Sequence, residues 1–238
     1  MRIGAILYNG ISSEDVGLRV EHHPRRIIPA KKREVVSVPG RNGDLVFEQN
    51  AYENYVQQYD VWVNPAYKDY YAVLRQVTGW LYAQKSYVRL EDEYDNETFR
   101  LAYYMGGDEF DNRLLLTGKG TLRFNCKPQR WLTIGEQRLE PEQGESLINP
   151  TAFDALPYIK VYGSGSGELS VGEITCTLND IDEYIELDSD LQNAYKGLEN
   201  KNSTVNIPVF PKLTPGANVV AWSGGITGVE IIPRWWTI

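Results

Sequence analysis

The sequence has little of the chemistry that metal centres and disulfide frameworks need. It contains two cysteines and two histidines in 238 residues. One cysteine pair, Cys126 and Cys176, does not make a disulfide framework in a chain of this length, so both thiols are expected to be reduced and buried. His22 and His23 are adjacent and have no Cys or His cluster near them, which leaves a zinc site short of ligands.

Long apolar runs are also absent. No stretch approaches the roughly 18 uninterrupted apolar residues of a membrane helix. The N-terminus becomes polar too early for a secretory signal. We therefore expect a protein that is made in a cytoplasm and does not insert into a membrane.

The composition that is present is globular, with 42% hydrophobic and 24% charged residues, which excludes a disordered or fibrous chain. Its net charge of −8 is unevenly spread. Residues 1–135 hold 18 basic and 17 acidic side chains, and residues 136–238 hold 6 basic and 15 acidic ones. Together with turn residues over 128–145, this predicts two domains, 1–135 and 136–238.

The first half predicts antiparallel strands and one helix, an α+β domain. An Asn-Gly turn at 42–43 predicts a hairpin over 33–49. Asn64-Pro65 should start the helix, Gly79 should end it, and an apolar stripe should pack it on the sheet. The stripe is Tyr67, Tyr70, Tyr71, Leu74, Val77 and Leu81. The predicted strands are 2–8, 35–38, 59–63, 87–90, 99–104 and 114–124.

The second half alternates apolar and polar residues in many short runs, which predicts a β-sandwich. Turns are expected at 163–167, Gly-Ser-Gly-Ser-Gly, and at 223–225, Ser-Gly-Gly. The former does not match a nucleophile elbow, a dinucleotide loop or a phosphate loop. The expected role is therefore a hairpin turn.

Acidic runs offer weak alternatives to a purely structural role. Glu91-Asp92-Glu93 and Asp180-x-Asp182-Glu183 lie in turns, whereas glycoside hydrolysis needs two carboxylates on opposing walls of a cleft. Calcium at Asp180, Asp182, Asp188 and Asp190 is a less favoured alternative, because the spacing of an EF-hand is missing. The sequence predicts no catalytic, cofactor or metal site.

A basic segment over residues 25–41 is the candidate interaction site. Its members are Arg25, Arg26, Lys31, Lys32, Arg33 and Arg41. The overall acidity and the lack of a nucleic-acid motif favour an acidic protein surface as its partner, such as the second half of a neighbouring copy.

Aromatic residues leave a second interpretation open. With 16 Tyr and 6 Trp, and Trp235-Trp236 as the most suggestive pair, the chain could present exposed rings to sugars. Packing and assembly are favoured over this carbohydrate-binding alternative, because Tyr and Trp suit protein interfaces equally well.

Several segments resemble the distal tail (Dit) proteins, also called siphovirus tail components, of long-tailed bacteriophages. In the first half these are 38–45, VPGRNGDL, and 52–54, YEN. In the second half, in the family's order, they are 157–165, 184–190, 210–213, 215–218 and 233–235.

The resemblance implies a structural, non-enzymatic virion protein with a ring-forming N-terminal domain and a C-terminal galectin-like β-sandwich. It also implies a hexamer, as one ring or stacked rings, that joins the tail tube to the tip or baseplate around a DNA channel. The implied partners are the tube protein, a lysin-like tip protein and receptor-binding proteins. We expect the basic segment to contribute to subunit contact.

Overall fold

The computed structural model describes residues 4–63, 69–113 and 117–238 and is mainly β, as the sequence predicts. The chain divides into two compact units: unit 1 runs to Arg130 and includes Ile238, and unit 2 is Trp131–Thr237. The division falls five residues before the one expected at 135/136. Each unit has its own apolar core.

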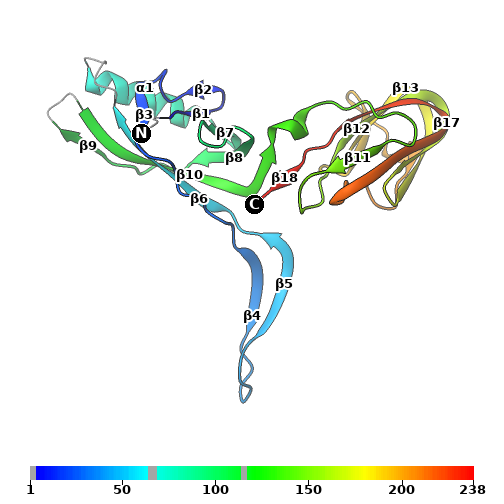
Figure 1. The fold of residues 1–238 in the computed structure, drawn as a ribbon, viewed down its shortest axis with the longest axis horizontal. Helices are drawn as coiled ribbons and strands as arrows, with labels where there is room; N and C mark the ends of the chain where they lie inside the picture. Colours follow the sequence, from blue (N-terminus) through cyan, green and yellow to red (C-terminus); the bar gives the residue numbers. More distant parts are fainter. Residues whose placement is uncertain (1–3, 64–68, 114–116) are drawn as a thin grey trace. The chain divides into compact units, whose positions relative to one another are not determined.

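Unit 1 is built on an antiparallel sheet in the order β2-β1-β7-β8-β10-β6-β3, with β9 paired to β10 (Figure 1). The strands are β1 (Ile6–Tyr8), β2 (Ile11–Ser12), β3 (Leu18–Val20), β6 (Tyr55–Val63), β7 (Val88–Asp92), β8 (Thr98–Tyr104), β9 (Phe110–Arg113) and β10 (Thr117–Leu132). Residues 2–3 and 114–116 of the predicted strands lie outside the described residues. The interior is rich in aromatic rings, and Phe124 contacts both Tyr8 and Tyr59.

Strand β10 runs eight residues past its expected end at Phe124. Cys126 is the last residue of β10 that pairs with β6. The missing amide hydrogen of Pro128 therefore costs no hydrogen bond in that ladder. Pro128 therefore does not end the strand, although the sequence suggests a break at this point.

Helix α1 (Tyr70–Tyr82) packs on this sheet, as predicted. Its N-cap is Asp69, whose Oδ1 accepts from the Ala72 amide at 3.0 Å. Trp80 Nε1 donates to the Tyr8 carbonyl at 3.2 Å and anchors the helix to β1. The expected end at Gly79 is wrong, because the helix continues to Tyr82. The expected start at 64–65 and Tyr67 lie outside the described residues.

The predicted hairpin is confirmed as the pair β4 (Lys31–Val36) and β5 (Leu45–Tyr52). We call residues 31–52 the arm. Gly40 and Gly43, at φ of +81° and +79°, form the turn that sequence reasoning places at Asn-Gly. Within the described residues the two strands pair only with each other (Figure 1).

Unit 2 is a curled antiparallel sheet in the order β11-β17-β12-β13-β14-β15, with β16 on β13, closed over one core. Its elements are η1 (Thr133–Glu136), β11 (Ser146–Asn149), β12 (Tyr158–Val171), β13 (Ile174–Asp188), β14 (Asn193–Lys196), β15 (Glu199–Asn200), η2 (Asn202–Thr204), β16 (Val205–Asn206), β17 (Gly216–Ile232) and β18 (Trp236–Thr237). Three of these strands, β12, β13 and β17, are much longer than the short runs that the sequence suggests.

The two glycine-rich segments expected as turns are wrong as turns, because both lie inside long strands. Residues 163–167 belong to β12, with a register shift between Gly165 and Gly167, and 223–225 belong to β17. The two strands pair side by side, and their backbones approach so closely that a Cβ on Gly163 would lie 2.2 Å from the Gly225 carbonyl oxygen. Glycine is needed here because two backbones lie close together. The sequence pattern alone does not distinguish this use of glycine from its use in a turn.

No helix in the described part of the chain is both long enough and apolar enough to cross a membrane.

Candidate subunit interface and a buried arginine network

The structure does not bring the six candidate basic residues to one place. Lys31, Lys32 and Arg33 lie on β4, Arg41 lies in the turn of the arm, and Arg25 and Arg26 precede the arm in a segment without regular structure. All six are exposed. Arg26 Nη2 donates to the Ile238 carbonyl oxygen at 3.2 Å.

Part of the arm's charge is balanced within the arm. The Glu48 carboxylate lies 3.2 Å from Lys31 Nζ and 3.3 Å from Arg33 Nη2. These contacts, Lys31 first, lower the pKa of Glu48. Lys32 and Arg41 form no ion pair with another described residue. The arm therefore keeps a basic character available to a partner.

The arm also exposes apolar side chains on both faces. Val35 pairs with Val46 on one face, and Glu34 with Phe47 on the other. Val35, Val46 and Phe47 are each more than half exposed. A hairpin of two strands cannot cover its own two faces, and an isolated one is marginally stable in water. The valines at 35, 36 and 38, which follow the charged residues 31–34, carry this signal, although the sequence drew attention only to the basic charge.

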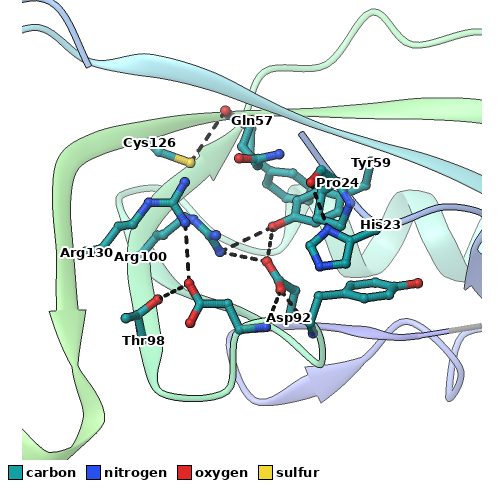
Figure 2. A network of polar contacts seen from close by, with 12 residues as sticks. His23, Pro24, Gln57, Tyr59, Asp92, Thr98, Arg100, Cys126 and Arg130 are labelled. Atoms are coloured by element: carbon teal, nitrogen blue, oxygen red, sulfur yellow. Dashed lines mark hydrogen bonds and ion pairs between the residues drawn. The ribbon is translucent and has the colours of Figure 1, made fainter. Parts of the chain in front are cut away.

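A buried ionic network lies on the inner face of the unit 1 sheet (Figure 2). Asp92, at the end of β7, accepts from Arg100 Nη1 at 2.8 Å and from the Tyr59 hydroxyl at 3.0 Å. Its other oxygen accepts from the amides of Tyr94 and Asp95. Burial opposes the charge on Arg100, but Tyr59 and Asp92 raise its pKa. The carboxylate therefore joins three strands and fixes the turn after β7.

Sequence reasoning missed this network because it treated 91–93 as a solvated acidic turn. The signal in the sequence is that these charged residues lie an even number of positions from buried residues of the same strand. Asp92 lies two residues after buried Leu90, Arg100 two before buried Ala102, and Arg130 four after buried Cys126. Alternate residues of a strand point to the same face, so a charged residue in step with buried apolar residues is buried with them.

The thiols are poor nucleophiles. Both cysteines are free and buried. Burial raises the pKa of Cys126 to about 11 and that of Cys176 to about 11.

Two of the four acidic residues considered for calcium have other partners. Asp188 is buried and receives Arg234 on both oxygens, at 2.8 and 2.9 Å, and Asp182 pairs with Lys196 at 2.8 Å. Over residues 4–63, 69–113 and 117–238, no three His, Cys, Asp or Glu side chains are grouped to hold a metal ion.

The aromatic pair considered for sugar binding is not exposed. Trp235 is 7% exposed and belongs to the core of unit 2. Trp236 stacks on Phe153 at 4.5 Å between centroids and donates to the Asp154 carbonyl. The interpretation of these tryptophans as a sugar platform is wrong, because their hydrophobic area is used in packing.

Comparison with known proteins rests on structure, since no protein-family model and no curated protein matches the sequence. The crystal structure of phage SPP1 Dit (gp 19.1), described as a paradigm of the hub adsorption apparatus in phages infecting Gram-positive bacteria, superposes with a TM-score of 0.71. The chain has a Dit-like fold. The alignment covers 97% of this chain and 98% of SPP1 Dit at 13% identity.

A second structure extends the comparison. A chain of the phage P2 baseplate, in its activated conformation with Ca, matches with a TM-score of 0.51 at 7% identity, over 97% of each chain. The Dit-like fold is thus matched along both units, with little sequence in common.

Proposed function

We propose that this chain is a structural hub protein of a phage tail, located at the distal end of the virion tail and without enzymatic activity. In this role six copies form a ring that joins the tail tube to the tip or baseplate, and DNA passes through the ring without specific binding. The neighbours would be the tube protein, a lysin-like tip protein and receptor-binding proteins, with synthesis in the host cytoplasm.

One observation carries the proposal: the match with SPP1 Dit, a hub protein, runs through both units and nearly the full length of both chains. A match to one unit alone would be compatible with many functions, because folds are reused. The carbohydrate-binding alternative loses its main support, since Trp235 is buried.

The arm supports an assembled state. Its apolar residues on both faces gain stability only when another surface covers them. Its basic residues suit an acidic partner, and residues 136–238 of a second copy carry a net charge of −9. We therefore assign subunit contact to the arm and to Arg25 and Arg26.

The first test is the solution mass of the purified chain by light scattering, with negative-stain images of the same sample. The expected result is a species near six times 27.1 kDa that appears as an open ring. A strict monomer, alone and also with its tube and tip proteins added, would contradict the hexamer.

Two variants test the assignment of the contact. Val35→Ser with Phe47→Ser should abolish the ring while leaving the secondary structure of the single chain intact in circular dichroism, because both side chains are exposed in the single chain. Arg25→Glu with Arg26→Glu should weaken the ring. The matched control is Leu198→Ser, an exposed apolar residue of unit 2 outside the arm. Rings that persist in both double variants would show that these residues do not form the subunit contact.

A further inference from the structure

Two arginines lie next to each other on the buried face of unit 1 (Figure 2). The side chains of Arg100, from β8, and Arg130, from β10, are 3% and 2% exposed. Burial and then the charge of Arg100 lower the pKa of Arg130. Two buried guanidinium groups need nearby negative charge, because an unpaired buried charge is costly.

The available carboxylates serve the two arginines unequally. Asp92 accepts from Arg100 at 2.8 Å. Among the described residues, Arg130 pairs only with Asp95, whose Oδ2 lies 3.7 Å from Nη1, beyond hydrogen-bond distance. The same oxygen accepts from Thr98 Oγ1 at 2.8 Å.

The remaining edge of Arg130 is without a partner. Nε and Nη2 are both buried and form no hydrogen bond with any described residue. These two N–H groups point the same way, which is the side-on geometry by which arginine binds both oxygens of a carboxylate or phosphate. Arg100 Nε and the Tyr55 hydroxyl are likewise buried without partners.

We propose that unit 1 binds one small oxyanion, of the class of formate or inorganic phosphate, on the Nε–Nη2 edge of Arg130. Arg100 and Tyr55 supply the neighbouring donors. Two buried amide oxygens, Gln57 Oε1 on β6 and Gln129 Oε1 on β10, also form no hydrogen bond with any described residue.

The segment 21–30 gives the anion a route of exchange. It has no regular secondary structure, and its Arg25 carbonyl accepts from Gln57 Nε2 at 3.2 Å. Arg26, on the same segment, lies near enough to add to the lowering of the pKa of Arg130. Local opening of such a segment requires far less free energy than unfolding the unit. This proposal is independent of ring formation.

The test is thermal unfolding of the full chain, titrated with formate or inorganic phosphate against chloride at constant ionic strength. A ligand of the folded state raises the Tm with the logarithm of its concentration, on the order of 5 °C at a hundred times its Kd. Arg130→Gln should give no such rise, and Arg75→Gln, an exposed arginine, should respond like the parent chain. An equal response in all three chains, or none in the parent, overturns the site.

A second measurement applies if Arg130→Gln does not fold. Arg130→Lys keeps the charge but lacks the side-on edge, and should lose most of the anion response. Selenate in crystals of the parent chain can be located by anomalous scattering. Selenate on the Arg130 edge supports the proposal. A water there, or a carboxylate from a neighbouring copy, overturns it.

Discussion

Asp92 in unit 1 and Asp188 in unit 2 perform the same task in different surroundings. Each ends a strand, accepts from the backbone amides two and three residues later, and binds an arginine. Arg100 is almost fully buried, whereas Arg234 is 32% exposed. Both carboxylates are thus buried, but the arginine is enclosed in unit 1 and partly exposed in unit 2. The contribution of each ion pair to stability should therefore follow the burial of its arginine.

The largest expected effect is at the enclosed site. Arg100→Met should destabilise unit 1 by about 3–5 kcal/mol, because it leaves the buried Asp92 charge uncompensated. Urea unfolding, with hydrogen exchange read by mass spectrometry to separate the units, measures this. A loss below 1 kcal/mol would mean that Tyr59 and the turn amides suffice for Asp92.

The open site should respond less. Arg234→Met should destabilise unit 2 by about 1–3 kcal/mol, since water can replace part of the lost interaction. The same unfolding and exchange measurements apply. A loss equal to that of Arg100→Met would break the comparison and make geometry, not burial, the governing variable.

The pH dependence of unit 2 sharpens the contrast. Burial of Asp188 acts in the opposite direction, but Arg234 and the turn amides hold its pKa below the ordinary value of about 3.9. The unfolded chain therefore binds this proton more readily, and the contribution to stability is present above that value and lost as pH falls through the folded pKa. Arg234→Met should flatten the fall in unit 2 stability below about pH 4. An unchanged slope would contradict the role of Arg234.

The smallest effect is expected on the arm. Glu48 contacts Lys31 and Arg33 on the exposed surface of the arm, so Glu48→Gln should leave the unfolding midpoint of the single chain unchanged. A measurable loss would show that the arm is held against other parts of the chain.

Local patterns in the sequence predict most of unit 1. Alternation of apolar and polar residues predicts β6, β7 and β8, the Asn-Gly turn predicts the arm, and apolar residues at helical spacing predict α1. The features that these patterns do not predict depend on contacts with residues that are distant in the sequence. Pro128 is tolerated on the β6 side because the pairing of β10 with β6 ends at Cys126. Gly163 and Gly167 are required because the backbone of residues 223–226 lies against them.

The candidate site shows the same limit. The six basic residues are visible in the sequence, but their division between the arm and segment 21–30 depends on where the strands begin. Asp92, Arg100 and Arg130 are predictable as buried only once their strands are known, because parity then places them on the apolar face.

The glycine contact between β12 and β17 limits which substitutions unit 2 can accommodate. At Gly163 and Gly225 the neighbouring backbone oxygen would lie 2.2 and 1.9 Å from an added methyl group, so even alanine is excluded. Gly144 has open space and is constrained only by its φ of +82°. Gly163 and Gly225 are thus constrained by atomic volume, whereas Gly224 is constrained both by volume and by its φ of +71°.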